Sequence, residues 1–390
     1  MTDALHALLN ARFRASPLFA LVAHRDLAPG ERAAFAALEG RGDYFGLLMP
    51  DTALPLSTKT VGHDTAALLR GLQQPGPLPG ALRDGASVAQ WQGLLQLIID
   101  GILEIETADG FVCGPRAAGL LPALAAPPSA PGSVLQQLSL RALHAAAAGP
   151  ALPPLVLSSR LYRHHTVPLT PAWQQRWAGV VDIREALGLH PGTALGALLF
   201  EHYGEVPHAA WHLWRREDLT QCEEQLLLPF KLYVSLHPDA LAPGLRLAVE
   251  TLARAGAPAF KLARGSAGLL RPDKLIAYVE SAAQRDALAA RLVPALRGLR
   301  AQGVPFTCAL TDDGMLSWGS DPPDGHRLLD WQRVESWRSW ITRRLAFALV
   351  QAHGSGAAPA ECVDFALERL RLAQVDTHTW SPSADAWREE

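Results

Sequence analysis

The chain has 390 residues, of which 49% are hydrophobic and 19% are charged, and its formal net charge is −3. This composition excludes an intrinsically disordered protein, and the length allows two or three domains. The slightly acidic balance lacks the basic excess of a general nucleic-acid binder, so we expect no nucleic-acid partner.

The four cysteines form no CxxC pair and no cluster at metal-ligand spacing; they are Cys113, Cys222, Cys308 and Cys362. We therefore expect reduced thiols, no metal and no cofactor in a cytoplasmic protein. The N-terminus lacks the apolar segment of a secretory signal, and no run of about 18 apolar residues is free of Pro and charge. No membrane partner is expected.

The first predicted region covers residues 1–130. Residues 3–48 are predicted to be helical, because Leu recurs at helical spacing. Ser87 is a predicted N-cap for a helix over 87–103, and residues 102–115 alternate as a hairpin with an Asp-Gly turn. Helices followed by a short hairpin suggest a partly winged-helix-like module. The absence of Lys and Arg from its last helix favours binding of a leader peptide or partner protein over DNA.

Residues 131–223 are predicted to be a helical connecting region. A helix is expected over 134–149, a strand or strand-like entry over 160–167, and another helix with Pro171 in its first turn. Four tryptophans gather in a short stretch, which indicates either an aromatic core or a groove for a peptide side chain: Trp173, Trp177, Trp211 and Trp214.

Residues 224–390 alternate strands and helices. Their order, β–α–β–β–α–β–β–α–α, predicts an α+β domain with helices packed on a mixed sheet. Helices are expected over 239–256, 281–303, 331–356 and 359–376, and a hairpin over 304–319.

The strand that begins this domain, "FKLYVSLHP" (residues 230–238), carries Lys within an apolar run. Successive side chains of a strand point to opposite faces, so Leu232 and Val234 are expected in the core. Lys231 and Tyr233 then share the other face.

Further cations follow on later strands. Lys261 lies in "FKLARG", and Arg271 and Lys274 precede a strand that contains Tyr278. If these strands pair, their cations meet on one sheet face and attract a phosphate-like anion, and a Lys crowded by cations has a lowered pKa. The alternative is an ordinary solvated face, or lysines that protect strand edges.

Two other arginines are candidates for the same site. Arg160 shares a face with Tyr162 if residues 160–167 form a strand. Arg338 lies on the helix expected over 331–356, where a solvated helix face is the alternative. The sequence contains no GxSxG, P-loop, GxGxxG or HExxH motif. It therefore gives no support for a hydrolase, an NTPase, a dehydrogenase or a zincin.

The blocks "KLYVSLHP", "FKLARG" and "RPDKLIAYVE" resemble the spaced blocks of the phosphothreonine lyase superfamily. They are most similar to those of the HopA-type effector family and of the stand-alone lyases of class V lanthipeptide pathways. The resemblance covers roughly residues 225–380. It implies a lyase-like domain that eliminates phosphate from phosphoserine or phosphothreonine, leaving a dehydro residue.

The resemblance also implies roles for individual residues. Lys261 matches the base that removes the Cα proton, and Lys231 is placed to stabilise the enolate. Arg271 and Lys274 would bind phosphate, with Arg160 and Arg338 as further candidates. The effector lyases have a His as the acid two residues after the first Lys, whereas this chain has Tyr233. Surrounding cations are expected to lower the pKa of Tyr233.

The function that follows is that of a carbon–oxygen lyase acting on a phosphorylated precursor peptide in lanthipeptide-like biosynthesis. A kinase-like protein is a possible partner. The alternative is a non-catalytic scaffold subunit of such a pathway, which binds the phosphopeptide or its leader. An effector that acts on a host target is a third reading, which the residues do not separate from the first.

Overall fold

The computed structural model describes residue 8 and residues 10–51, 58–121, 132–177, 180–219, 228–322 and 335–383. The thiol of Cys222 lies outside these residues. The other three cysteines are free thiols. Helices and sheets occur together throughout, as an α+β protein requires.

The N-terminal region holds two small antiparallel sheets where a helix was predicted over 3–48. One sheet has the order β5-β1-β6-β7 and the other β2-β3-β4. The helix prediction was wrong because Phe13 is buried between Arg12 and Arg14, and both arginines pair across the sheet with glutamates of β6. That alternation is typical of a strand. The strands are β1 (Arg12–Ala15), β2 (Phe19–Ala23), β3 (Tyr44–Pro50), β4 (Lys59–Gly62), β5 (Gly76–Pro77), β6 (Leu103–Thr107) and β7 (Gly110–Val112).

The predicted helix after Ser87 is confirmed as α5 (Val88–Ile99). The Ser87 side chain accepts a hydrogen bond from the Gln90 backbone N–H, completing a capping box. The hairpin β6–β7 is also confirmed, but it pairs with β1 in the four-stranded sheet, and the winged-helix arrangement is not confirmed. The other helices here are α2 (Pro29–Ala34), α3 (His63–Gly71), α4 (Gly80–Gly85) and α6 (Pro115–Ala118).

In the middle region α7 (Val134–Ala147) confirms the predicted helix. The strand expected over 160–167 was wrong, because α8 (Pro154–Tyr162) runs into that segment. Pro154 begins this helix, and Leu157 and Leu161, four residues apart, are buried on one side of it. Three shorter helices follow: α9 (Pro171–Arg176), which starts at the predicted Pro171, α10 (Val180–Ala186) and α11 (Ala194–His202).

A seven-stranded sheet dominates the rest of the chain, in the order β13-β14-β10-β12-β11-β9-β8. Every pairing that the structure describes in it is antiparallel, so the mixed sheet was a wrong prediction. Two of its strands precede residue 224, inside the predicted connecting region. The strands are β8 (Tyr203–Val206), β9 (Trp211–Arg216), β10 (Phe230–Val234), β11 (Ala259–Ala263), β12 (Leu275–Val279), β13 (Cys308–Ala309) and β14 (Leu316–Ser320).

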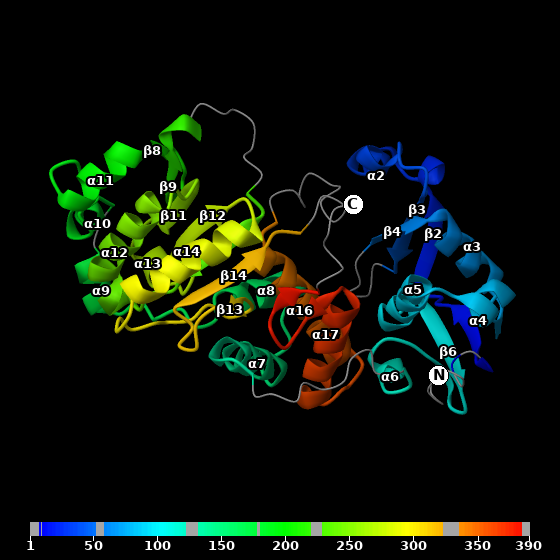
Figure 1. The fold of residues 1–390 in the computed structure, drawn as a ribbon. Helices are drawn as coiled ribbons and strands as arrows, with labels where there is room; N and C mark the ends of the chain where they lie inside the picture. The colour runs from blue at the N-terminus through cyan, green and yellow to red at the C-terminus, as the bar shows by residue number, and fades with distance from the viewer. Residues whose placement is uncertain are drawn as a thin grey trace.

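Helices cover both faces of this sheet (Figure 1). On one face, α12 (Leu241–Arg254) and α14 (Ala282–Ala295) bury apolar residues against Leu232, Phe260 and Ala277. The other face meets side chains from α8 and α16 (Trp337–Gly354), described below. The remaining elements are α13 (Ser266–Leu269), α17 (Pro359–Leu372), β15 (Val375–Asp376) and β16 (Ser381–Pro382).

The helices α16 and α17 join the sheet to the N-terminal region, and in Figure 1 they lie between the two. Their apolar residues share one core with α5, α7 and α8. Trp337 and Trp340 are buried in that core. A Cβ at Gly319 would lie 2.6 Å from Cδ1 of Trp337, so only glycine lets α16 approach β14 this closely.

Candidate functional site

The strand pairings bring the predicted cations onto one face of the large sheet. Lys231 on β10 lies opposite Tyr278 on β12, and Tyr233 lies opposite Ile276. Ile276 in turn lies opposite Lys261 on β11. The alternation along each strand therefore places Lys231, Tyr233 and Lys261 on the same face, as the sequence predicted.

Neither Lys231 nor Lys261 protects a strand edge, and Lys231 does not belong to a solvated face. Strands β10 and β11 are both interior strands of the seven. Lys231 is 7% exposed and Tyr233 is 2% exposed. Charged side chains are seldom buried unless they are paired or have a function, so the charge on this face needs a specific explanation.

The ammonium group of Lys231 forms an ion pair with Asp321, which follows β14. Asp321 Oδ1 also accepts a hydrogen bond of 3.0 Å from the backbone N–H of Trp337, the first residue of α16. The carboxylate thus fixes Lys231 to the sheet and to the helix that covers it.

Lys261 has a different environment. Its Nζ lies 4.4 Å from the ring centroid of Trp211 and 5.2 Å from that of Tyr278. Within the described residues this amine has no hydrogen bond and no ion pair. Burial, followed by the neighbouring charge of Lys231, lowers the pKa of Lys261 to about 8. The predicted lowering is confirmed, with burial as its largest cause.

Arg271 and Arg338 share one carboxylate, that of Asp273. Arg271 binds it through Nε (2.9 Å) and Nη2 (2.7 Å), and Arg338 binds it through Nη1 (2.7 Å). The Tyr162 hydroxyl donates to the same carboxylate at 3.1 Å. Although burial acts to raise it, the pKa of Asp273 is held at about 2 by Arg338 and Arg271.

The two arginines differ in access. The side chain of Arg271 is 26% exposed and lies beside the rings of Tyr162 and Trp211. Arg338 is fully buried, and its remaining N–H groups donate to the backbone oxygens of Pro305 and Tyr162. The solvated helix face considered for Arg338 was therefore wrong. Arg338 holds Asp273 in place, and Arg271 is the arginine that a ligand can reach.

Lys274 is on the same face but is enclosed by acceptors. It is fully buried, and its Nζ donates to the backbone oxygen of Leu236 and to Oε1 of Gln302, both at 2.6 Å. Burial lowers the pKa of Lys274 to about 7. A role in binding phosphate stays a prediction, and it would require these two hydrogen bonds to be replaced.

The pKa of the Tyr233 hydroxyl differs from the expected one. Cations were expected to lower the pKa of its hydroxyl, but burial, followed by the electrostatic influence of the neighbouring Tyr162 hydroxyl, raises this pKa well above the usual value. The hydroxyl makes no hydrogen bond with the described residues. Tyr233 is therefore a neutral hydrogen-bond donor and a weaker acid than predicted.

Arg160 is separated from Tyr162 by the helical geometry of α8. Residues two apart on a helix do not share a face, so the reason for grouping them fails. Arg160 is exposed, and its guanidinium lies near Gly149. The assignment of Arg160 to the phosphate site remains a prediction, and the position of Arg160 on α8 does not support it.

Among the described residues, the site is cationic overall. Lys231, Lys261, Arg271 and Arg338 face two carboxylates, Asp273 and Asp321. This leaves an excess of two positive charges when Lys261 is protonated and of one when it is neutral, and a positive site of this kind suits a phosphomonoester.

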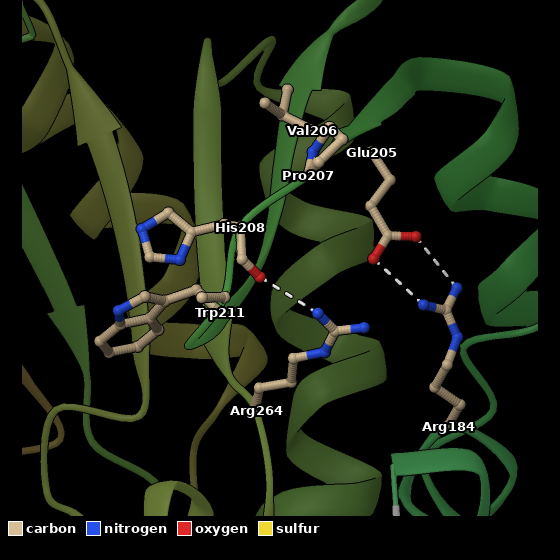
Figure 2. A pocket seen from close by; sticks show the side chains of 8 residues that line it. Arg184, Glu205, Val206, Pro207, His208, Trp211 and Arg264 are labelled. Atoms are coloured by element: carbon tan, nitrogen blue, oxygen red, sulfur yellow. Dashed lines mark hydrogen bonds and ion pairs between the residues drawn. The ribbon is translucent and has the colours of Figure 1, made fainter.

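A cleft of about 590 Å³ is lined in part by Trp211, the residue whose ring also contacts Lys261. Figure 2 shows Trp211 and His208 on one side, the Glu205–Arg184 pair on the other, and Arg264 between them. Trp211 is the common wall, because its ring carries Lys261 on the sheet face and also lines the cleft.

The sequence carries a signal for this site that motif reading missed. Only four of its 35 Lys and Arg residues are lysines, and three of the four lie on this face: Lys231, Lys261 and Lys274. Three of the five tyrosines, Tyr162, Tyr233 and Tyr278, also surround it. Arg serves wherever a permanent cation suffices, whereas only Lys can present a neutral amine.

Solved structures to which this chain is similar include two effector proteins of Pseudomonas syringae. The effector from pathovar syringae strain 61 has a TM-score of 0.33 and 12% identity. The effector from pathovar tomato strain DC3000 has a TM-score of 0.35 and 12% identity. Each alignment covers 64% of this chain and 98% of the effector.

A phosphothreonine lyase, from a study of its catalytic mechanism, is also similar, with a TM-score of 0.27 and 11% identity. That alignment covers 54% of this chain and 96% of the lyase. These are the kinds of protein that the sequence blocks resemble, but likenesses this remote carry no functional argument.

No family model matches the chain, and no curated protein sequence matches it. Of the helices in the described ranges, none is both long and apolar enough to cross a membrane.

Proposed function

We propose that this protein is a lyase that eliminates phosphate from phosphoserine or phosphothreonine in a peptide. The observation that carries the proposal is the amine of Lys261. It lies on an interior strand between two aromatic rings, without an ion pair among the described residues, and its pKa is lowered to about 8. A base must be partly neutral near working pH, and this amine meets that requirement.

In the proposed reaction, neutral Lys261 takes the Cα proton of the phosphorylated residue. The electron pair of the Cα–H bond forms the Cα=Cβ double bond. The Cβ–O bond breaks, and its electrons leave with the phosphate. The leaving oxygen takes up a proton from solvent, so the products are a dehydro residue in the peptide, hydrogen phosphate and a protonated Lys261.

The other residues have supporting roles. Lys231 is positioned by Asp321 and would stabilise the enolate that develops on the substrate carbonyl. Arg271 has N–H groups beyond those that bind Asp273 and would hold the phosphate. Neutral Tyr233 would donate a hydrogen bond to the leaving oxygen.

Incubation of the full chain with a phosphothreonine peptide, followed by mass spectrometry, tests the proposal. We expect loss of phosphoric acid by the wild-type protein and a loss of this activity of about 10²- to 10⁴-fold in Lys261→Ala. Exposed Arg254 on α12 provides the control Arg254→Ala, which should leave the activity unchanged. Elimination that persists in Lys261→Ala would contradict the assignment of the base.

A non-catalytic phosphopeptide-binding subunit is the second candidate. The raised pKa of Tyr233 favours it, because burial makes this hydroxyl a poor acid for the leaving group. Such a subunit would bind the phosphopeptide in the same assay and return it unchanged.

The context we propose for either function is maturation of a ribosomally made, lanthipeptide-like precursor. The N-terminal region would then bind the leader peptide or a kinase-like partner. An adjacent kinase-like gene and a short precursor rich in Ser, Thr and Cys would support this context.

A further inference from the structure

The cleft behind Trp211 contains a cation that nothing in the proposed reaction uses. Arg264 follows β11, the strand that carries Lys261, and its side chain is exposed. Its Nη1 donates to the backbone oxygen of His208 at 3.1 Å, which aims the guanidinium into the cleft (Figure 2). Within the described part of the chain, no carboxylate pairs with Arg264.

The carboxylate that lines the same cleft is fully engaged. Glu205 accepts from both terminal nitrogens of Arg184, at 3.1 and 3.0 Å. Its Oε1 also lies 3.0 Å from Nδ1 of His212, which is buried. The Glu205 oxygens are therefore satisfied, and with two arginines against one glutamate the cleft has a net positive charge.

The cleft shares one residue, Trp211, with the candidate site. Lys261 lies against the Trp211 ring, and Arg271 is 5.5 Å from the same ring. Residues of an extended peptide are spaced about 3.4 Å apart. A substrate whose phosphorylated residue lies at Lys261 would thus bring a residue one or two positions away past Trp211 and into the cleft.

We infer that the cleft lined by Trp211, His208 and Arg264 is a substrate subsite that selects an acidic side chain near the phosphorylated residue. Arg264 forms an ion pair with the carboxylate of that side chain, and the aliphatic part of the side chain packs on Trp211. The inference rests on the proposed function for the identity of the substrate, a phosphopeptide, and assigns its sequence preference.

The test uses a set of phosphothreonine peptides that differ only in having Glu, Gln or Lys at one of the two positions on either side of the phosphorylated residue. Elimination by the full chain is followed by mass spectrometry. Binding is measured separately by fluorescence anisotropy on Lys261→Ala. At one position we expect Glu to be preferred over Gln by about 3- to 10-fold, in KM rather than in kcat.

Charge reversal sharpens the result. Arg264→Glu should change the preference at that position from Glu to Lys, because the cleft would then offer a carboxylate to a cation. Arg264→Gln should remove the preference without reversing it. Arg254→Glu, an equal charge change on the opposite side of the sheet, should leave the preference for Glu intact.

The experiment distinguishes failure of the lyase proposal from failure of the proposed subsite. If no peptide is eliminated but the Glu preference and its reversal appear in binding, the lyase proposal fails and the subsite stands. If peptides are eliminated or bound without a preference for Glu, or with one that survives in Arg264→Glu, the subsite is overturned.

Discussion

The two faces of the seven-stranded sheet are built from alternate residues of the same strands, yet they differ in kind. Leu232 and Phe260 point to a dry, apolar face under α12 and α14. Their neighbours Lys231, which is buried, and Lys261, which is partly exposed, point to a charged face. One face stabilises the fold, and the other gathers charged groups where water is scarce.

The charged face has a thermodynamic cost that the apolar face offsets. The pKa of Lys261, lowered to about 8, corresponds to roughly 3 kcal/mol of stability that is missing below pH 8. Burying a single Leu side chain contributes about 1.5–3 kcal/mol. One or two residues such as Leu232 are enough to offset the burial of one unpaired amine. Strain of this kind is typical of functional sites.

The largest expected effect comes from Asp273→Asn on the charged face. We expect a loss of about 3–5 kcal/mol in the free energy of unfolding at pH 7, because Arg338 would remain buried without its carboxylate. The pKa of Asp273 is about 2 in the folded protein, below its unfolded value, so its contribution is present above pH 4 and is lost as the pH falls toward 2.

Denaturant unfolding at pH 7 and pH 3 checks this, with Leu232→Ala as the control from the apolar face. The control should cost about 2–5 kcal/mol at both pH values. The comparison of the two faces breaks down if the cost of Asp273→Asn is as independent of pH as that of the control.

A smaller effect is expected for Tyr233→Phe. Loss of the buried hydroxyl should lower kcat for phosphate elimination by about 10²-fold, while the Kd for the phosphopeptide and the stability change little. Steady-state kinetics and calorimetry measure the two quantities. An unchanged kcat would mean that the Tyr233 hydroxyl has no part in catalysis and that the side chain contributes only to packing.

The smallest effect is a shift in the pH dependence of kcat/KM. In the wild-type protein kcat/KM should rise about tenfold per pH unit below pH 8 and level off above it, because neutral Lys261 is the active form. Lys231→Met removes a neighbouring positive charge, which stabilises the ammonium form and should move the inflection upward by up to about one unit.

Lys231→Arg retains the charge and is the matched variant for this shift. Its inflection should stay near the wild-type value even if its rate falls. An inflection that does not move in Lys231→Met would show that burial alone sets the pKa of Lys261.

The sequence determined the parts of this protein that depend on local chemistry. Alternation along "FKLYV" put Lys231 and Tyr233 on one face, Ser87 set the start of α5, and Asp-Gly set the turn of the β6–β7 hairpin. Each of these rests on interactions between residues close in the chain, which is why a pattern alone could predict them.

Only the tertiary structure decided which lysine has its amine enclosed by hydrogen-bond acceptors and which has it against aromatic rings. Lys261 and Lys274 have similar sequence surroundings, yet Lys274 meets two acceptors from Leu236 and Gln302, whereas Lys261 meets the ring of Trp211. These partners come from segments 28 to 50 residues away in the chain. Burial and neighbouring charge set a pKa, and both depend on contacts between distant segments that no local pattern encodes.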